Sequence, residues 1–184
     1  MTETLLQTLQ ALYRENDEML RHTYHRSLSF QDGLFDRWER AKRLGFGDNT
    51  SIYNSAQVFG EVSVGACSFI GAFTILDGGY APVRIGAYVS IAAGVHVYSH
   101  DTVLWSLSGG EAPKRVGAVT IEDRCYVGSQ SVIACGVHIA SCSVVAANSF
   151  VNRNVPSRTI VGGSPAIPIG RVEGEGSNIR MVFD

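Results

Sequence analysis

The sequence is poor in charged side chains. Only 17% of its 184 residues are Asp, Glu, Lys or Arg, against about 25% in an average soluble protein. The formal net charge of −2 provides no positive field for a phosphate backbone, so we expect no nucleic-acid partner. No apolar run reaches the roughly 18 residues that a membrane helix needs, so we expect no membrane span.

Export signals and metal-binding motifs are also missing. The chain begins MTETLLQTLQ, without the basic start and apolar block of a signal peptide, so we expect a cytoplasmic protein. The four cysteines include no CxxC pair and no zinc-ligand spacing. We therefore expect no bound metal and reduced thiols packed as small hydrophobic groups. These cysteines are Cys67, Cys125, Cys135 and Cys142.

Residues 1–46 form a helical segment in this interpretation. Leucines recur at three-to-four spacing from Thr2 to about Arg26, which predicts an amphipathic helix. Asp32 is placed to cap a second helix that runs through Trp38 and ends near Leu44. The second helix carries a cationic run that is either a solvated face or a phosphate-binding face: Arg37, Arg40, Lys42 and Arg43.

After Gly47 an aliphatic residue recurs every six positions. Its follower is often Gly or Ala, and a second small or β-branched residue stands four positions on, for example Ser68, Ser131 and Ser143. The thirteen members of the aliphatic column are Ile52, Val58, Val64, Ile70, Ile85, Ile91, Val97, Ile121, Val127, Ile133, Ile139, Val145 and Val151.

A period of six fits neither a helix nor a long twisted strand. It fits short straight segments joined by corners, with the aliphatic column inside and a small residue turning each corner. Stacked coils pair each backbone with the next at about 4.8 Å. The fold class is therefore all-β, a parallel β-helix of roughly four or five coils preceded by an α-helical segment.

Two excursions interrupt this pattern, one between Leu76 and Ile85 and a longer one over residues 98–120. A regular scaffold that tolerates a long excursion commonly carries function there. The longer loop contains a histidine and a tryptophan and is the first candidate for a site.

From Gly47 to Val172 the sequence resembles the hexapeptide-repeat acyltransferases, especially the sugar and maltose O-acetyltransferase-like branch and relatives from bacterial polysaccharide clusters. The resemblance depends on the repeat, the segment Tyr98–Asp101 and the closing Gly162–Ala166. It implies a left-handed coil over residues 47–172, although the general preference for right-handed crossovers predicts the opposite. It also implies a homotrimer with sites between subunits, acetyl-CoA as co-substrate and a role in polysaccharide biosynthesis. Residues 173–184 are expected to form a flexible tail.

His100 matches the catalytic histidine of that family. Imidazole suits a general base at neutral pH, because its unperturbed pKa is about 6.5. Asp101 either orients His100 or points away from it, since neighbouring residues often diverge. Asp77 matches an acidic position that holds the acceptor sugar, or is an ordinary turn residue beside two glycines. Trp105 offers a sugar-stacking wall or plain loop packing.

For coenzyme A the resemblance implies Ser129 and Ala147, one coil apart, and then Asn152 and Arg153. Arg153 suits pairing with a phosphate. The closing segment departs from the family pattern, because Ile167 replaces a basic residue often found after Pro-Ala. Arg171 is the candidate substitute.

The resulting hypothesis is direct acetyl transfer in a ternary complex to a sugar hydroxyl, with an amine as the less favoured acceptor. A γ-class carbonic anhydrase shares the coil and binds zinc through three histidines, but the spacing from His96 to His100 does not match its ligand pair. His22 and His25 fall in the first helix, and His138 is expected to point outward. A non-catalytic scaffold is the other alternative, because fold does not fix function.

Overall fold

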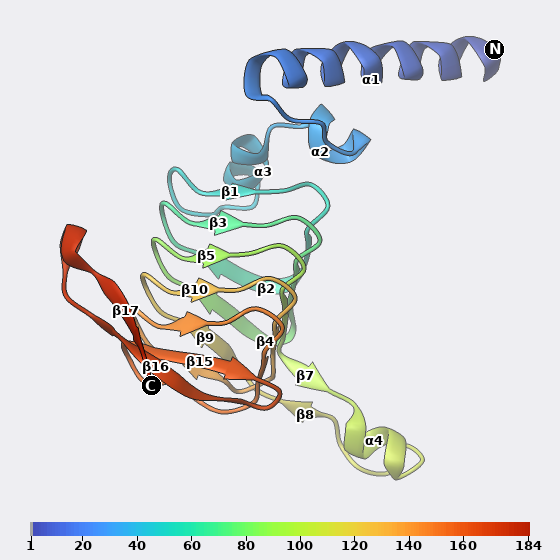
Figure 1. Cartoon of the computed structure of the whole chain (residues 1–184). Coiled ribbons are helices and arrows are strands. Elements are labelled where there is room, and N and C mark those ends of the chain that lie inside the picture. The colour runs from blue at the N-terminus through green and yellow to red at the C-terminus, as the bar shows by residue number, and fades with distance from the viewer. Residues whose placement is uncertain (1) are drawn as a thin grey trace.

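The computed structural model describes residues 2–184 and consists of a stack of coils with three attachments. Helices precede the first coil, an arm leaves the middle of the stack, and a hairpin follows the last coil (Figure 1). The arm is the part of residues 98–120 that departs from the coil. It comprises β7 (His100–Asp101), α4 (Val103–Leu107) and β8 (Arg115–Val116).

Three helices, not two, make up the N-terminal segment. These are α1 (Thr2–Tyr24), α2 (Phe30–Leu34) and α3 (Arg37–Arg43). The expected cap is corrected, because Phe35 is extended and ends α2, and Asp36 then caps α3 by accepting from the backbone N–H groups of Trp38 and Glu39. The Asp32 carboxylate instead accepts from the backbone of Ser55 and ties α2 to the first coil. Within residues 2–184 no helix is long and apolar enough to cross a membrane.

The cationic run on α3 is largely an anchor to the coil. The Arg40 guanidinium donates to the backbone carbonyls of Tyr53 and Ala56, and the Arg37 guanidinium lies 5.3 Å from the ring centroid of Tyr53 in the first coil. Arg43 forms an exposed ion pair with Glu39 one helical turn away. Two of the four cations are therefore occupied by contacts that hold α3 in place.

Short parallel strands build three faces. One face contains β1 (Ser51–Ile52), β3 (Phe69–Ile70), β5 (Ser90–Ile91), β10 (Tyr126–Val127), β13 (Val144–Val145) and β15 (Thr159–Gly163). The strands β2 (Gln57–Val64) and β4 (Ile75–Ile85) run round a corner and join the other two faces. These faces are completed by β6 (His96–Tyr98), β11 (Val132–Ile133) and β14 (Phe150–Val151) on one side, and β9 (Val119–Ile121) and β12 (His138–Ile139) on the other.

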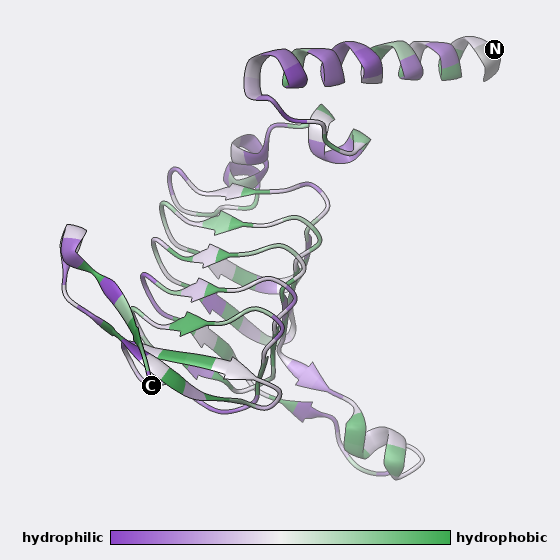
Figure 2. Cartoon of the chain, in the orientation of Figure 1, coloured by the Kyte–Doolittle hydropathy of each residue, from purple (hydrophilic) through white to green (hydrophobic). Residues whose placement is uncertain are grey.

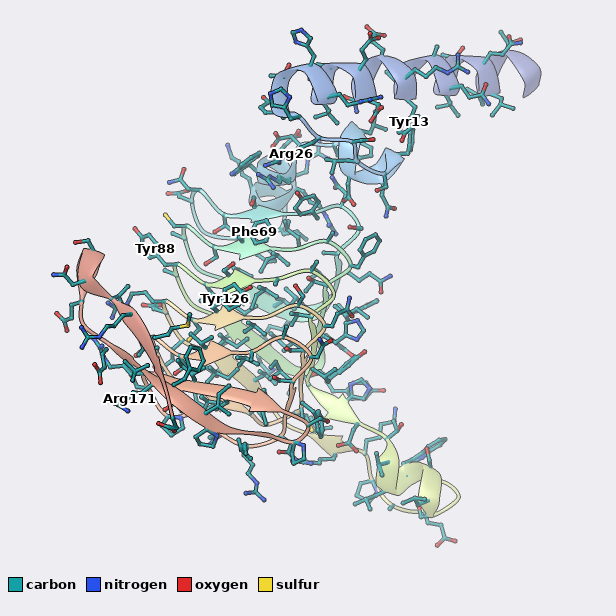
Figure 3. All side chains as sticks on the ribbon, in the orientation of Figure 1. Tyr13, Arg26, Phe69, Tyr88, Tyr126 and Arg171 are labelled. Carbon is teal, nitrogen blue, oxygen red and sulfur yellow. The ribbon has the colours of Figure 1, made fainter. Side chains whose placement is uncertain are left out.

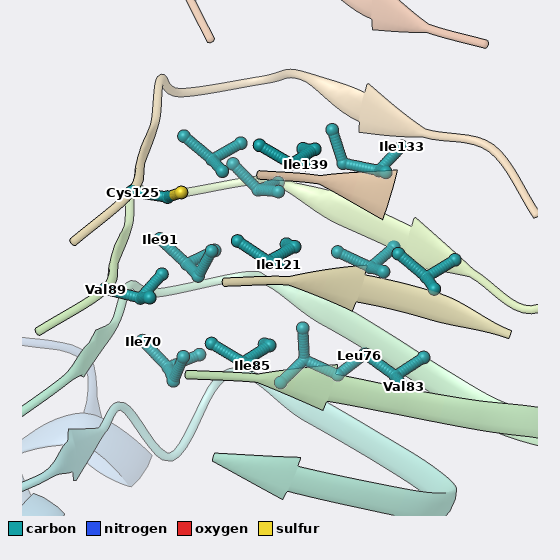
Figure 4. Close-up of a cluster of buried hydrophobic side chains, with 14 of the residues drawn as sticks. Ile70, Leu76, Val83, Ile85, Val89, Ile91, Ile121, Cys125, Ile133 and Ile139 are labelled. Carbon is teal, nitrogen blue, oxygen red and sulfur yellow. The ribbon is translucent and has the colours of Figure 1, made fainter. Parts of the chain in front are cut away.

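Strand register confirms the repeat. Val127 pairs with Val145 and Ile133 with Val151, each 18 residues later, which is three hexads per coil. Twelve of the thirteen column residues are buried, and Val58 is half-buried against the same core. Figure 4 shows the side chains in successive layers, with Ile91 above Ile70 and Ile121 above Ile85. The fold is therefore a parallel β-helix with five complete coils and one further strand, β15.

The corners are built differently from the expectation. The left-handed backbone falls three positions after the column residue, as at Cys67 (φ 56°) and Asn148 (φ 56°), and not at the small residue beside the column. The residue beside the column must be small for a steric reason. A Cβ at Gly65 would lie 2.6 Å from the backbone nitrogen of Ala87 in the next coil. Close approach of the next coil therefore explains the glycine.

The last twelve residues form structure where a flexible tail was expected. The hairpin consists of β16 (Ala166–Glu173), the 3-10 turn Gly176–Asn178 and β17 (Arg180–Phe183), and β17 pairs antiparallel with β16. Glu173 accepts hydrogen bonds from the guanidinium groups of Arg171 and Arg180, at 2.8 and 2.9 Å. Backbone pairing and these ion pairs fix the segment, and neither is visible as a hydrophobic pattern.

Truncation of Ile121 tests whether the aliphatic column carries the stability of the coil. This side chain is fully buried, so Ile121→Ala should lower the free energy of unfolding by about 2–5 kcal/mol through lost burial and a cavity. Its neighbour Thr120 faces outward on the same strand and provides the control, since Thr120→Ala should change stability by only about 0.5 kcal/mol. Urea denaturation measures both, and equal losses would contradict the assignment of the column to the core.

Candidate active site

His100 lies where the arm leaves the coil, directly after β6. Its Nδ1 atom is fully buried, while the side chain as a whole is 22% exposed. The exposed part of the ring therefore belongs to the edge that carries Nε2 and the ring carbons. One nitrogen faces the protein and the other edge faces solvent, which is the geometry that a general base requires.

Asp77 is the carboxylate nearest to the buried nitrogen of His100. Its Oδ2 atom lies 3.4 Å from Nδ1, and its side chain is only 15% exposed. Asp77 ends up there because β4 pairs with β6 and places it opposite Tyr98, two residues before His100. The other carboxylate oxygen accepts from the backbone of Gly79 at 2.9 Å.

Within residues 2–184 the Nδ1 atom of His100 has no hydrogen-bond partner, although Asp77 is within ion-pair distance. The carboxylate is close enough, but the donor direction is poor. A buried polar atom without a partner is unfavourable, and a small rotation of either group would supply the bond. Contacts of this kind commonly tighten when substrate binds.

Tyr80 packs on the imidazole of His100. The two ring centroids are 4.1 Å apart and the planes are inclined by 34°. The Tyr80 hydroxyl accepts from the ammonium of Lys114, which comes from the returning side of the arm. Two excursions from the coil therefore meet over the histidine.

Asp101 turns away from His100. Consecutive residues of a strand point to opposite sides, and both residues lie in β7. The Asp101 carboxylate accepts from the backbone of Val103 at 3.2 Å, lies 3.9 Å from the guanidinium of Arg115 and is 3.7 Å from the Cys135 thiol. Asp77, and not Asp101, is therefore the carboxylate that lies against the His100 ring in this structure.

Trp105 lies on α4 at the far end of the arm, away from the coil (Figure 1). The helix is apolar, as its green colour in Figure 2 shows, and its side chains are exposed, Leu107 most of all at 80%. Within this chain Trp105 packs beside Gly110, in the same arm. The structure does not bring it to His100.

The four expected coenzyme A residues on the coil separate into two pairs on different corners. Ser129 and Ala147 follow β10 and β13, so they lie one coil apart between the first and second faces. Asn152 and Arg153 follow β14, on the corner where His100 leaves β6. Two coil spacings, roughly 10 Å, separate the level of Asn152 and Arg153 from the level of His100. Both Asn152 and Arg153 are exposed.

Arg171 is not a free cation. Its guanidinium pairs with Glu173 at 2.8 Å and lies 3.8 Å from Asp184. It belongs to the C-terminal hairpin, on the opposite side of the view from the arm (Figure 3). Its expected role as a substitute phosphate ligand therefore has no support from its surroundings.

Cys135 lies beside Asp101, but the other cysteines and histidines of this paragraph lie outside the group of residues around His100. Burial raises the pKa of the Cys125 thiol to about 11, which suits packing and not nucleophilic attack. Burial also raises the pKa of Cys135, the thiol beside Asp101. His138 pairs with Glu122 at 2.8 Å on the surface, and His96 shares a 3.2 Å hydrogen bond with the Tyr98 hydroxyl. Among residues 2–184 no three His, Cys, Asp or Glu side chains converge as metal ligands would.

Three residues near His100 were not identified from the sequence: Tyr80, Lys114 and Cys135. Tyr80 and Lys114 lie in the two interruptions of the repeat, so a search of both loops for aromatic and cationic side chains would have found them. Cys135 follows its column residue by two positions, as Ser99 follows Val97. Comparison of equivalent corner positions in neighbouring coils would have placed it beside the site.

Known proteins share both the repeat and the overall fold. A family profile described as the hexapeptide repeat of succinyl-transferase matches residues 118–153. A hexapeptide-repeat-containing acetyltransferase from Vibrio cholerae superposes with a TM-score of 0.66 at 28% identity, over 90% of this chain and 91% of that chain. A second structure of that acetyltransferase, complexed with acetyl coenzyme A, gives a TM-score of 0.52 at 25% identity over 94% and 89% of the two chains.

Other matches are shorter or less complete. A variant of AntD, an N-acyltransferase from Bacillus cereus, in complex with dTDP-4-amino-4,6-dideoxyglucose and coenzyme A, superposes with a TM-score of 0.59 at 25% identity, over 71% of this chain and 87% of that chain. The 2,3,4,5-tetrahydropyridine-2,6-dicarboxylate N-acetyltransferase of Staphylococcus aureus is 38% identical over 60 residues, 33% of this chain. That match spans 25% of the relative's length.

The superposition on the Vibrio cholerae protein spans 90% of this chain, and the family profile lies within the regular repeat. In its repeat and in its fold the chain is therefore similar to the hexapeptide-repeat acetyltransferases.

Proposed function

We propose that this protein transfers an acetyl group from acetyl-CoA to a sugar or sugar-like acceptor, with His100 as general base. One observation carries the proposal. The imidazole has its Nδ1 buried against the Asp77 carboxylate at 3.4 Å and its opposite edge open to solvent, at the base of the arm. This arrangement holds a base in one orientation and leaves a nitrogen free for a substrate proton.

The proposed reaction is a single displacement in a ternary complex. The exposed ring nitrogen of His100 takes the proton of the acceptor hydroxyl or amine as that atom bonds to the thioester carbonyl carbon. Backbone N–H groups at the coil edge stabilise the oxyanion. The carbon–sulfur bond then breaks, and the proton moves from His100 to the coenzyme A thiolate. Asp77 stabilises the imidazolium that exists between the two proton transfers.

The corner that carries His100 offers a path for coenzyme A. Arg153 stands two coils beyond His100 on that corner and is exposed, so its guanidinium can pair with a phosphate while the thioester lies near the histidine. We propose Arg153 and Asn152 as the phosphate end of this site. We propose that Ser129 and Ala147, on the neighbouring corner, line the rest of the coenzyme A site. The complexes of the similar structures with acetyl-CoA and coenzyme A support coenzyme A as the ligand of this protein.

The acceptor is proposed to be a sugar, free or nucleotide-linked, of the kind that polysaccharide synthesis consumes. The AntD variant binds an amino sugar linked to dTDP, and the Staphylococcus aureus relative is an N-acetyltransferase. We nevertheless favour a hydroxyl acceptor, because an alcohol is a weak nucleophile and depends on a base in the transition state. An enzyme that consumes acetyl-CoA must meet it where the cell makes it, so a cytoplasmic location is part of the proposal.

We further propose that the coil is left-handed and that the chain assembles as a trimer. A rigid superposition cannot invert handedness, so the TM-score of 0.66 supports the coil sense that the family resemblance implies. The exposed apolar helix at the end of the arm supports assembly, because a neighbouring copy would cover it. Analytical ultracentrifugation measures the mass in solution, and a monomer at micromolar concentration would contradict the trimer.

A thiol-release assay tests the activity. Purified protein with acetyl-CoA should release free thiol only when a suitable acceptor is present, because the proposed reaction has no acyl-enzyme intermediate. The acceptors should include matched pairs that differ only by a hydroxyl or an amine at one position. Thiol release without any acceptor, with an acetyl group left on a cysteine, would contradict the single-displacement mechanism.

Arg153 tests the coenzyme A site. Loss of a charge-assisted contact to phosphate costs about 1.5–3 kcal/mol, so Arg153→Ala should raise the KM for acetyl-CoA roughly 10- to 100-fold and leave the acceptor KM unchanged. Arg84→Ala is the matched control, because Arg84 is also exposed on the coil and pairs with Glu61 at 3.7 Å, away from the corner that carries His100 and Arg153. Equal effects of the two substitutions would remove Arg153 from the site.

A further inference from the structure

The short excursion in β4 is an extra loop that contains Tyr80. Gly60 of the preceding coil pairs with Gly78, and Val62 pairs with Val83. Two steps along β2 therefore correspond to five along β4, and the three additional residues fall within positions 79–82. Without them the chain would run straight to the next face, and no side chain would reach over His100.

Contacts from two directions hold Tyr80 in place. The Ser99 hydroxyl accepts from the backbone N–H groups of Tyr80 and Ala81, each at 3.3 Å, and Ser99 is fully buried. The Lys114 ammonium donates to the phenol oxygen and lies 4.6 Å from the ring centroid. Contacts within the chain therefore hold both the backbone and the ring of Tyr80.

The orientation of the His100 ring needs such a support. Rotation of an imidazole about its last torsion is broad, with little intrinsic preference, and Nδ1 has no hydrogen bond among the described residues to fix it. The Tyr80 ring, 4.1 Å away, lies against one face of the imidazole. A ring that turned by a quarter would collide with Tyr80 and would move Nδ1 away from Asp77.

We propose that Tyr80 is a positioning residue for His100, a proposal that rests on the function proposed above. Its ring keeps the imidazole plane fixed, so that Nδ1 stays toward Asp77 and the exposed nitrogen toward the acceptor. Lys114 in turn holds the Tyr80 ring. Tyr80 acts through His100 and takes no part in proton transfer.

Two substitutions separate the ring from the hydroxyl. Tyr80→Leu removes the flat ring and should lower kcat roughly 10- to 100-fold, as a misplaced catalytic group does, with the KM for acetyl-CoA within about twofold of the wild-type value. Tyr80→Phe retains the ring and should keep kcat within about threefold. Rescue by phenylalanine, together with the split between kcat and KM, is what a merely structural role would not produce.

Tyr88 provides the matched control. It is an exposed tyrosine at a coil corner on the side away from the arm (Figure 3), and its φ of 56° is one that asparagine tolerates. Tyr88→Asn should leave kcat and KM unchanged. Full kcat in Tyr80→Leu, or an equal loss in Tyr80→Phe, would overturn the positioning role.

A second readout does not depend on turnover. The stacked Tyr80 ring should shift the carbon-bound ring protons of His100 upfield in NMR spectra, in the wild type and in Tyr80→Phe but not in Tyr80→Leu. Signals that Tyr80→Leu leaves unmoved would overturn the proposal. If the wild type shows the shift but acetylates no acceptor, the proposed function is wrong. The contact between Tyr80 and His100 would then be present but would have no catalytic role.

Discussion

Substitution of His100 by asparagine should lower kcat roughly 10²- to 10⁴-fold, the range that a positioned general base contributes. Asparagine removes the titratable ring but leaves a polar side chain of moderate size at a position that is 22% exposed, so the fold should persist. The KM for acetyl-CoA should stay near the wild-type value, because the proposed phosphate contact lies two coils away at Arg153. Steady-state thiol release measures both constants.

His96→Asn is the control variant for His100→Asn. His96 lies in β6, four residues before His100, and its ring nitrogen contacts the Tyr98 hydroxyl. It should cost far less activity than His100→Asn. Equal losses in the two variants, or full activity in His100→Asn, would remove the general-base assignment.

The second large effect is expected at Asp77. Asp77→Asn removes the negative charge 3.4 Å from His100 Nδ1 while keeping the size of the side chain. The imidazolium formed during transfer loses its counter-charge and the ring loses its best-placed partner. We expect kcat to fall about 10²-fold, as when a catalytic group loses its orientation.

Asp101→Asn is the control for Asp77, because the two carboxylates flank His100 in different ways. Asp101 contacts Arg115, Cys135 and the backbone of Val103, so its substitution should alter kcat much less. A larger loss in Asp101→Asn than in Asp77→Asn would show that the active geometry differs from this one. Parallel measurement of kcat and of the KM for each substrate distinguishes a base-orienting role from the acceptor-holding role that the family resemblance implies for Asp77.

The repeat could be predicted because its cause is local. A coil of 18 residues returns each aliphatic side chain to the same inward column, so a sequence period of six is enough to identify Ile91, Ile121 and Ile133 as core. The longer excursion keeps the hexad phase, because Val97 and Ile121 are 24 residues apart, whereas the shorter one shifts the phase by three residues and is visible in the sequence as a break between Leu76 and Ile85. The handedness could not be derived this way, because the same period suits a coil of either sense.

The site was less predictable because it depends on pairings between distant segments. The sequence left open whether Asp101 orients His100 or points away from it. Alternation along β7 turns the two side chains apart, and the pairing of β4 with β6 places Asp77 beside His100 instead. Tyr80 stacks on His100 only because three extra residues bulge from β4. Trp105 was a candidate for acceptor binding because it is an aromatic residue in the longer excursion, but the arm places α4, and Trp105 with it, away from the coil.

Calorimetric titration of acetyl-CoA into the purified protein tests the central claim most directly, because it needs no knowledge of the acceptor. The account predicts saturable binding with one site per chain, unchanged in His100→Asn and weakened in Arg153→Ala. An absence of binding up to millimolar acetyl-CoA would contradict acyl transfer, and the arrangement of Asp77 and Tyr80 around His100 would then require another explanation.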